Sequence, residues 1–75
     1  MISEEKIAVQ VSDRVLEASR LLNEALFLVK GSCPEAEFLV CRTAIGQVLG
    51  ELLLSVLNPI YRSHPQIMPE DLKDF

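Results

Sequence analysis

The sequence predicts an all-α fold, an antiparallel helical hairpin that dimerises into a four-helix bundle. Two long segments, about residues 4–30 and about residues 34–57, carry apolar side chains at helical spacing. A strong helix breaker at residues 31–34 separates these two segments. Both segments contain more apolar residues than one pair of helices can bury. Residues 1–75 are expected to form a single helical domain, since a chain of 75 residues is too short for two.

The first predicted helix spans about residues 4–30. Ser3 is its expected N-cap, and Lys30 in its last turn suits the helix dipole. Gly31 is expected just after the helix, where glycine commonly ends helices. Apolar residues repeat at alternating spacings of three and four, which is typical of a bundle seam. This seam consists of Ala8, Val11, Val15, Ala18, Leu22, Ala25 and Val29.

The second predicted helix spans about residues 34–57. Pro34 suits its first position, and Glu35 and Glu37 in the first turn are favoured by the helix dipole. Because the connection is short, the two helices are expected to be antiparallel neighbours. The apolar face of this helix consists of Phe38, Cys41, Ile45, Val48, Leu49, Leu52, Val56 and Ile60.

Pro59 leaves two alternatives for the end of the second helix. The helix either continues to about residue 62 with a kink at Pro59, or Asn58 caps a separate short turn. The phase of Ile60, which matches the apolar face before it, favours the continuation. His64 precedes another proline and therefore avoids the α region, so helix should end there. Residues 64–75 are predicted to form a tail that is mostly extended or loosely docked, with at most one turn at residues 69–73.

Two glycines, Gly46 and Gly50, lie one helical turn apart in the second helix. Each glycine costs roughly 1 kcal/mol in a helix interior relative to alanine. A close contact with another helix is the simplest explanation for the pair, and close approach of a ligand is the alternative. In a hairpin that closes near residues 31–33, Ala18 falls opposite Gly46. We therefore expect a tight helix crossing at Ala18, Gly46 and Gly50.

The apolar residues of the two helices exceed what a hairpin can bury. Each predicted helix has 14 apolar residues, whereas a helix-pair seam uses only about two positions in seven. Exposed apolar surface of that extent is rare on monomers, and a two-fold dimer is the usual way to cover it. The residues expected in the dimer interface are Val9, Leu16, Phe27, Leu28, Phe38, Val40, Leu52 and Val56.

Composition argues against several classes of partner. The net charge of −4 and the scattered basic residues speak against nucleic acid. Two cysteines, Cys33 and Cys41, and one histidine form no metal motif, so no metal or cofactor is expected. On a helix these cysteines are about 12 Å apart, beyond the reach of about 7 Å for a disulfide. No uncharged apolar run approaches membrane-spanning length and no secretory signal is evident, so we expect a cytoplasmic protein without a membrane partner.

No catalytic motif occurs in the sequence, so no catalytic residue is assigned and nothing argues for an enzyme. The expected function is that of a small homo-oligomeric interaction or structural module. The alternative is a small-molecule binder or enzyme whose site lies at the subunit interface. The residues of that alternative site are Arg42, Glu51, Tyr61, Arg62 and His64.

Three of these residues also have an ordinary structural explanation. Arg42 would either form an ion pair between the helices, with Glu17 or Glu24 as its partner, or lay its aliphatic stem along the interface rim with its charge in water. Glu51 would lie on the solvent face of the second helix, and His64 would hydrogen-bond locally in a turn. These structural roles and the site at the subunit interface both stay open at the level of sequence.

Residues 58–65 read Asn-Pro-Ile-Tyr-Arg-Ser-His-Pro. The segment from Gly46 through Pro69 resembles small uncharacterised bacterial proteins that have a similar Asn-Pro-x-Tyr-Arg-x-His-Pro ending. The resemblance covers roughly the last third of the chain. It implies a helical hairpin but no activity, so it assigns no site residue.

Overall fold

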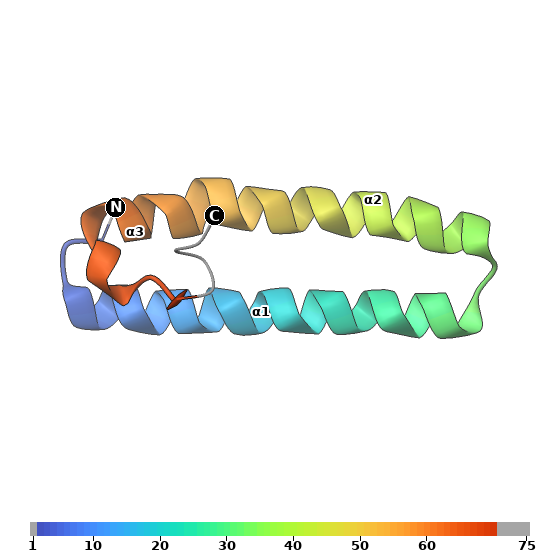
Figure 1. The fold of residues 1–75 in the computed structure, drawn as a ribbon, viewed down its shortest axis with the longest axis horizontal. Helices are drawn as coiled ribbons and strands as arrows, with labels where there is room; N and C mark the ends of the chain where they lie inside the picture. The colour runs from blue at the N-terminus through green and yellow to red at the C-terminus, as the bar shows by residue number, and fades with distance from the viewer. Residues whose placement is uncertain (1, 71–75) are drawn as a thin grey trace.

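The computed structural model describes residues 2–70, and within this range the chain is all-α, as predicted. The helical elements are α1 (Glu5–Ser32), α2 (Glu35–Glu51), a π-helical segment (Leu52–Leu57), α3 (Asn58–Ser63) and a 3-10 turn (Pro65–Ile67). The π-helical segment joins α2 to α3 without a break, so these three elements form one continuous rod. Figure 1 shows this rod beside α1 and running in the opposite direction.

The molecule is elongated, with extents of 45 × 21 × 16 Å and a radius of gyration of 14.6 Å. A compact domain of this length has a radius of gyration of about 11 Å. The two helical rods lie side by side along most of their length (Figure 1). Each rod therefore has one side against its neighbour and most of its circumference in solvent.

The ends of α1 differ from those expected. The N-cap is Glu4 rather than Ser3, and the Glu4 side chain forms no capping hydrogen bond. At the other end the helix continues through Gly31, and the backbone N–H of Cys33 donates to the Val29 carbonyl at 2.9 Å. No described glycine has a positive φ, so Gly31 does not form the expected left-handed cap.

The helical backbone continues through Pro59. A proline inside a helix has no N–H to donate, and its ring clashes with the carbonyl four residues earlier. The π-helical segment removes this conflict, because the N–H of Asn58 donates to the carbonyl of Leu53, five residues earlier. The wider turn makes room for the ring. Helix ends at His64, whose φ of −135° and ψ of 66° lie outside the α region.

The core lies at one end of the molecule, where α1 begins and α3 ends (Figure 1). Its buried apolar side chains are Ala8, Leu57, Ile60 and Tyr61. Ile67 and Met68, from the segment after α3, pack against this core. In contrast, α2 has no buried residue. The half of the molecule near the α1–α2 connection is therefore held by half-buried contacts alone.

The first residues of the predicted tail are docked on the start of the chain, which is one of the two alternatives that the sequence left open. His64 Nε2 donates a hydrogen bond to the Ile2 carbonyl at 2.7 Å. Gln66 Nε2 donates to Glu5 Oε1 at 2.9 Å, so this segment contacts the start of α1. Residues 71–75, which include most of the turn expected at residues 69–73, lie outside the described residues.

Candidate functional site

Two members of the predicted polar site, Tyr61 and His64, are structural residues at the buried end. Tyr61 is 2% exposed, and its hydroxyl shares a hydrogen bond of 2.5 Å with Ser12 Oγ. His64 is 8% exposed and is bonded to the Ile2 carbonyl. These bonds satisfy buried polar atoms and join segments far apart in the sequence. Neither side chain is directed to an open site.

The other three predicted site residues, Arg42, Glu51 and Arg62, are exposed. Arg42 lies roughly 28 Å from Tyr61 along the helical rod, at the usual rise of an α-helix. Glu51 accepts a hydrogen bond of 2.6 Å from Ser55, one turn further on. The five residues of the predicted site are therefore not brought together within the chain.

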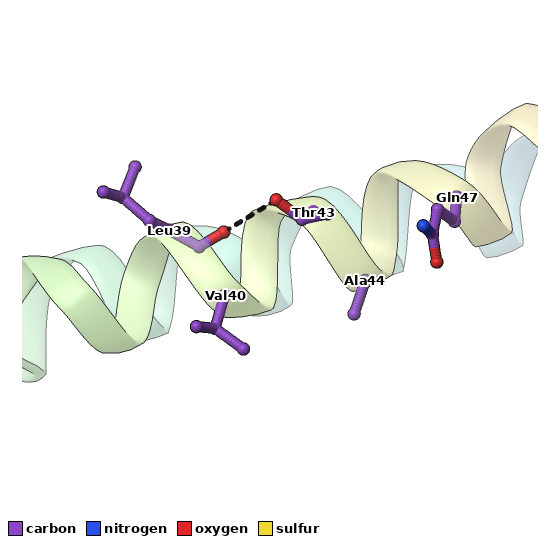
Figure 2. A pocket seen from close by; sticks show the side chains of 5 residues that line it. All are labelled: Leu39, Val40, Thr43, Ala44 and Gln47. Carbon is purple, nitrogen blue, oxygen red and sulfur yellow. Dashed lines mark hydrogen bonds between the residues drawn. The ribbon is translucent and has the colours of Figure 1, made fainter.

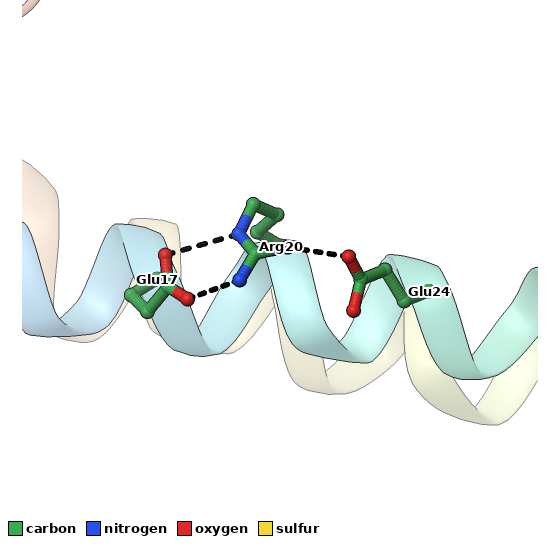
Figure 3. Close-up of polar contacts among 3 residues, drawn as sticks. All are labelled: Glu17, Arg20 and Glu24. Carbon is green, nitrogen blue, oxygen red and sulfur yellow. Dashed lines mark hydrogen bonds and ion pairs between the residues drawn. The ribbon is translucent and has the colours of Figure 1, made fainter.

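The expected ion pair between Arg42 and α1 is not formed, because Arg20 engages both candidate partners (Figure 3). Arg20 Nε donates to Glu17 Oε2 at 3.0 Å, and the guanidinium also contacts Glu24. The hydrogen bond from Arg20 lowers the pKa of Glu17 below its usual value. This network lies on the solvent side of α1 and keeps one stretch of that side charged.

We expect Arg20→Ala to change the thermal unfolding midpoint only slightly, because exposed ion pairs contribute little and are screened by salt. The pKa of Glu17 is lowered in the folded chain. Any contribution of this ion pair to stability is therefore fully present at pH values above the pKa of Glu17 in the unfolded chain. It is lost as the pH falls through the lowered folded-state pKa. Thermal melts of both proteins at neutral and acidic pH, in low and high salt, measure this. A difference that grows in acid would contradict the assignment.

Arg42 instead lines a small cavity between the two helices. The cavity has a volume of about 150 Å³ and is lined by Asn23, Leu26, Phe27, Lys30, Phe38 and Arg42. Within residues 2–70, neither Lys30 nor Arg42 forms a hydrogen bond or ion pair through its side chain. Two cations beside aromatic rings attract anions, but the lining provides no nucleophile and no general base.

A more extensive feature is the side of α2 and the following π-helical segment that points away from α1. We call it the outer α2 face, and it consists of Ala36, Leu39, Val40, Thr43, Gly46, Gln47, Gly50, Leu53 and Leu54. None of these residues is charged, and Val40 and Leu54 are 72% and 64% exposed. The Thr43 hydroxyl donates to the Leu39 carbonyl at 3.1 Å, so its hydrogen is already used within the helix (Figure 2).

A shallow depression lies over the first half of this face and extends to Ala44 beside it. It has a volume of about 490 Å³ and is lined by Leu39, Val40, Thr43, Ala44 and Gln47. Figure 2 shows these five side chains spread along one stretch of α2 without converging on a centre. Such a broad, open and apolar surface suits contact with another helix better than enclosure of a small molecule.

Gly46 and Gly50 lie on the outer α2 face and do not contact α1. A Cβ added at either position would have no atom within 4 Å. The expected tight crossing with Ala18 is therefore not formed within the chain, and Ala18 itself is exposed. The physical reason is rotational: Gly46 lies about 100° around the helix from the half-buried Ile45. Gly46 is exposed, whereas Ile45, Leu49 and Gly50 are half-buried.

The residues expected in the dimer interface divide into two groups. Val9, Leu16, Phe38, Leu52 and Val56 are half-buried within the single chain. Leu16 and Val56 pack against the core, which removes part of their surface from any second contact. Phe27, Leu28 and Val40 are 69%, 73% and 72% exposed. Only these last three remain strong interface candidates from the sequence.

Sequence reasoning missed the outer α2 face as a surface of its own. The sequence predicts that Gly46 and Gly50 face Ala18, and it does not distinguish the outer side of the helix from the inward one. A signal for a second seam was nevertheless present. Apolar or small residues alternate at spacings of three and four through Ala36, Leu39, Thr43, Gly46, Gly50 and Leu53.

The helical run Glu35–Ser63 has the length and composition that would also let it cross a membrane, with a mean hydropathy of 1.5 over a stretch of 18 residues. None of that stretch is buried in the structure. A core helix of a soluble protein passes the same test. The sequence predicts no membrane partner, but the length and composition of this run place a membrane among the outcomes to be tested.

No family model matches the sequence, and no curated protein or solved structure matches the chain. The functional argument therefore depends on the surface of the chain itself.

Proposed function

We propose that the protein is a helical hairpin that associates as a homodimer, a four-helix bundle that serves as an interaction or structural module. The surplus of exposed surface carries this proposal. The chain exposes 5417 Å², whereas a compact monomer of 8.4 kDa exposes about 4,600 Å². The difference of about 800 Å² matches the area that one partner loses in a standard protein interface.

The exposed surface includes many large apolar side chains. These are Ile7, Leu21, Phe27, Leu28, Leu39, Val40, Val48, Leu53 and Leu54. Burying one such side chain fully is favourable by about 1.5–3 kcal/mol relative to leaving it in water. Contiguous apolar patches of this extent are uncommon on monomers. A second copy of the chain would cover part of this surface.

The position of the core supports the same proposal. Within residues 2–70, the buried apolar residues lie at the end formed by α3, the residue before it and the start of α1. The other half of the molecule, around the α1–α2 connection, has no buried side chain in α2. Chains of this size commonly need a further source of stability beyond one small core. In the proposed four-helix bundle, the second copy supplies apolar contacts where the single chain has none.

We expect sedimentation equilibrium at micromolar concentration to give twice the chain mass of 8.4 kDa. Because only the folded state would bind a second copy, the thermal midpoint should rise with chain concentration. A folded species of 8.4 kDa, with a midpoint that does not depend on concentration, would contradict the proposed dimer.

A further inference from the structure

The outer α2 face is a second helix-packing seam on a helix that already has one. The inward seam of α2 contacts α1, whereas no described part of the chain covers the outer face. Apolar or small residues recur along the outer α2 face at spacings of three and four, as apolar residues do along the inward seam. A helix that is apolar on opposite sides is normally buried on both. This pattern therefore requires a second neighbour for α2.

The two glycines identify what kind of neighbour fits. Glycine destabilises a helix interior relative to alanine. A Cβ at Gly46 or Gly50 would have no atom within 4 Å. Packing within the chain therefore does not require glycine rather than alanine at either position. Small residues on a helix surface allow a second helix backbone to approach closely. The partner at this point is therefore a helix rather than a small ligand.

The order of large and small side chains along the face favours a second copy of α2 in antiparallel orientation. Along the face the order is Leu39 and Val40, then Thr43, Gly46 and Gly50, then Leu53 and Leu54. Two such helices crossing at their small residues place the large side chains of one copy's start beside those of the other copy's end. A parallel pair would instead bring the first-turn residues Glu35 and Glu37 beside their own copies. An antiparallel pair separates these like charges and opposes the helix dipoles.

The exposed leucines of α1 are a poorer surface for the second copy. Leu21 and Leu28 lie one turn from the Glu17–Arg20–Glu24 network. Covering them would remove these charged groups from water, which is costly without new partners. The outer α2 face is bordered by Glu37 and Glu51, but within residues 2–70 neither forms an ion pair, so covering this face breaks no such network. The surplus of about 800 Å² is of the size that one such interface requires.

We infer that a second copy of the chain docks on the outer α2 face, with the two α2 helices antiparallel and crossing at Gly46 and Gly50. This inference rests on the proposed dimer and assigns its surface. It replaces the interface expected from the sequence, most of which is half-buried against α1 or the core.

The test compares the dimer dissociation constants of Gly46→Leu, Val40→Glu and wild type by sedimentation equilibrium. Gly46→Leu should raise the dissociation constant about ten- to hundredfold, because added bulk at a close contact is strongly unfavourable. Its helical circular dichroism should not fall, since the chain leaves room for the side chain and leucine favours helix over glycine. Val40→Glu places a charge on the same face and should weaken the dimer similarly. Ala18→Leu places the same side chain at an exposed site on α1 and is the matched control.

The possible outcomes separate this surface from the dimer itself. A monomeric wild type would overturn both the proposed dimer and this surface. A dimeric wild type whose affinity is unchanged by Gly46→Leu and Val40→Glu would overturn the surface alone, as would equal weakening by Ala18→Leu. Vesicles of phosphatidylcholine and phosphatidylglycerol provide a further arm. If wild type floats with them and Val40→Glu does not, the face binds lipid and the assignment to a second copy is wrong.

Discussion

Replacing Ile60 with alanine should lower the free energy of unfolding by about 2–5 kcal/mol. Ile60 is fully buried at the centre of the core, beside Leu57 and Tyr61. The substitution removes buried apolar surface and leaves a cavity that the neighbouring helices can close only in part. Stability of a whole domain is only about 5–15 kcal/mol, and small chains lie toward the low end. We therefore expect a large share of the native stability to be lost.

Urea unfolding followed by circular dichroism measures this loss, with chain concentration held constant because the proposed dimer links stability to concentration. Ile7→Ala is the matched control, since Ile7 is 47% exposed and its truncation leaves no enclosed cavity. Ile60→Val should show a smaller loss of about 0.5–1.5 kcal/mol. Equal effects of Ile60→Ala and Ile7→Ala would show that the core is not centred on α3.

The all-α class could be predicted because it depends on local patterns. Apolar residues spaced three and four apart identify a helix from about two turns of sequence. The breaker at residues 31–34 separates the two apolar segments. The ends of α1 were less predictable because capping is a competition between near-equal alternatives. Gly31 can end a helix in the left-handed region, but it also tolerates the helical region that it adopts here.

The same patterns could not predict which side of each helix contacts the other. A sequence with apolar residues on both sides of α2 does not indicate which side α1 covers. Pairing Ala18 with Gly46 depended on counting from the connection, and a displacement by one residue rotates a helix by about 100°. Ile45 rather than Gly46 is the half-buried residue, so Gly46 belongs to the outer α2 face. That one rotation separates an expected contact within the chain from the exposed surface that we propose for a second copy.

The polar residues near the end of the chain illustrate a second limit. Tyr61 and His64 were candidates for a site because they are polar and close together in sequence. Their partners, Ser12 and Ile2, are 49 and 62 residues away. No local pattern identifies such pairs, whereas the fold places the partners side by side. The same chemistry that suggested a ligand site is used to fix one end of the molecule.

Tyr61→Phe should destabilise the protein by about 1–3 kcal/mol, because it leaves the Ser12 hydroxyl buried without a partner. Ser12 is 3% exposed, and its 2.5 Å hydrogen bond to Tyr61 is the one that the structure assigns to its side chain. Removing both groups in Ser12→Ala/Tyr61→Phe should restore part of the loss, because no buried donor or acceptor then remains. The coupling energy of this double-mutant cycle should be about 0.5–3 kcal/mol. Urea unfolding of the four proteins gives this coupling directly, and strictly additive losses would contradict the bond.

The same double-mutant cycle also tests what fixes the rotation that places Gly46 on the outer α2 face. Tyr61 must point toward Ser12 on α1 for the bond to form, and this requirement limits the rotation of the α2–α3 rod about its axis. With that rotation fixed, Ile45 lies toward α1 and Gly46 lies away from it. The double variant recovers stability but loses this directional constraint. We therefore expect it to bind its second copy more weakly than wild type does, by sedimentation equilibrium, even where its unfolding free energy approaches the wild-type value. Wild-type affinity in the double variant would show that apolar packing around Ile60 is sufficient to set the rotation.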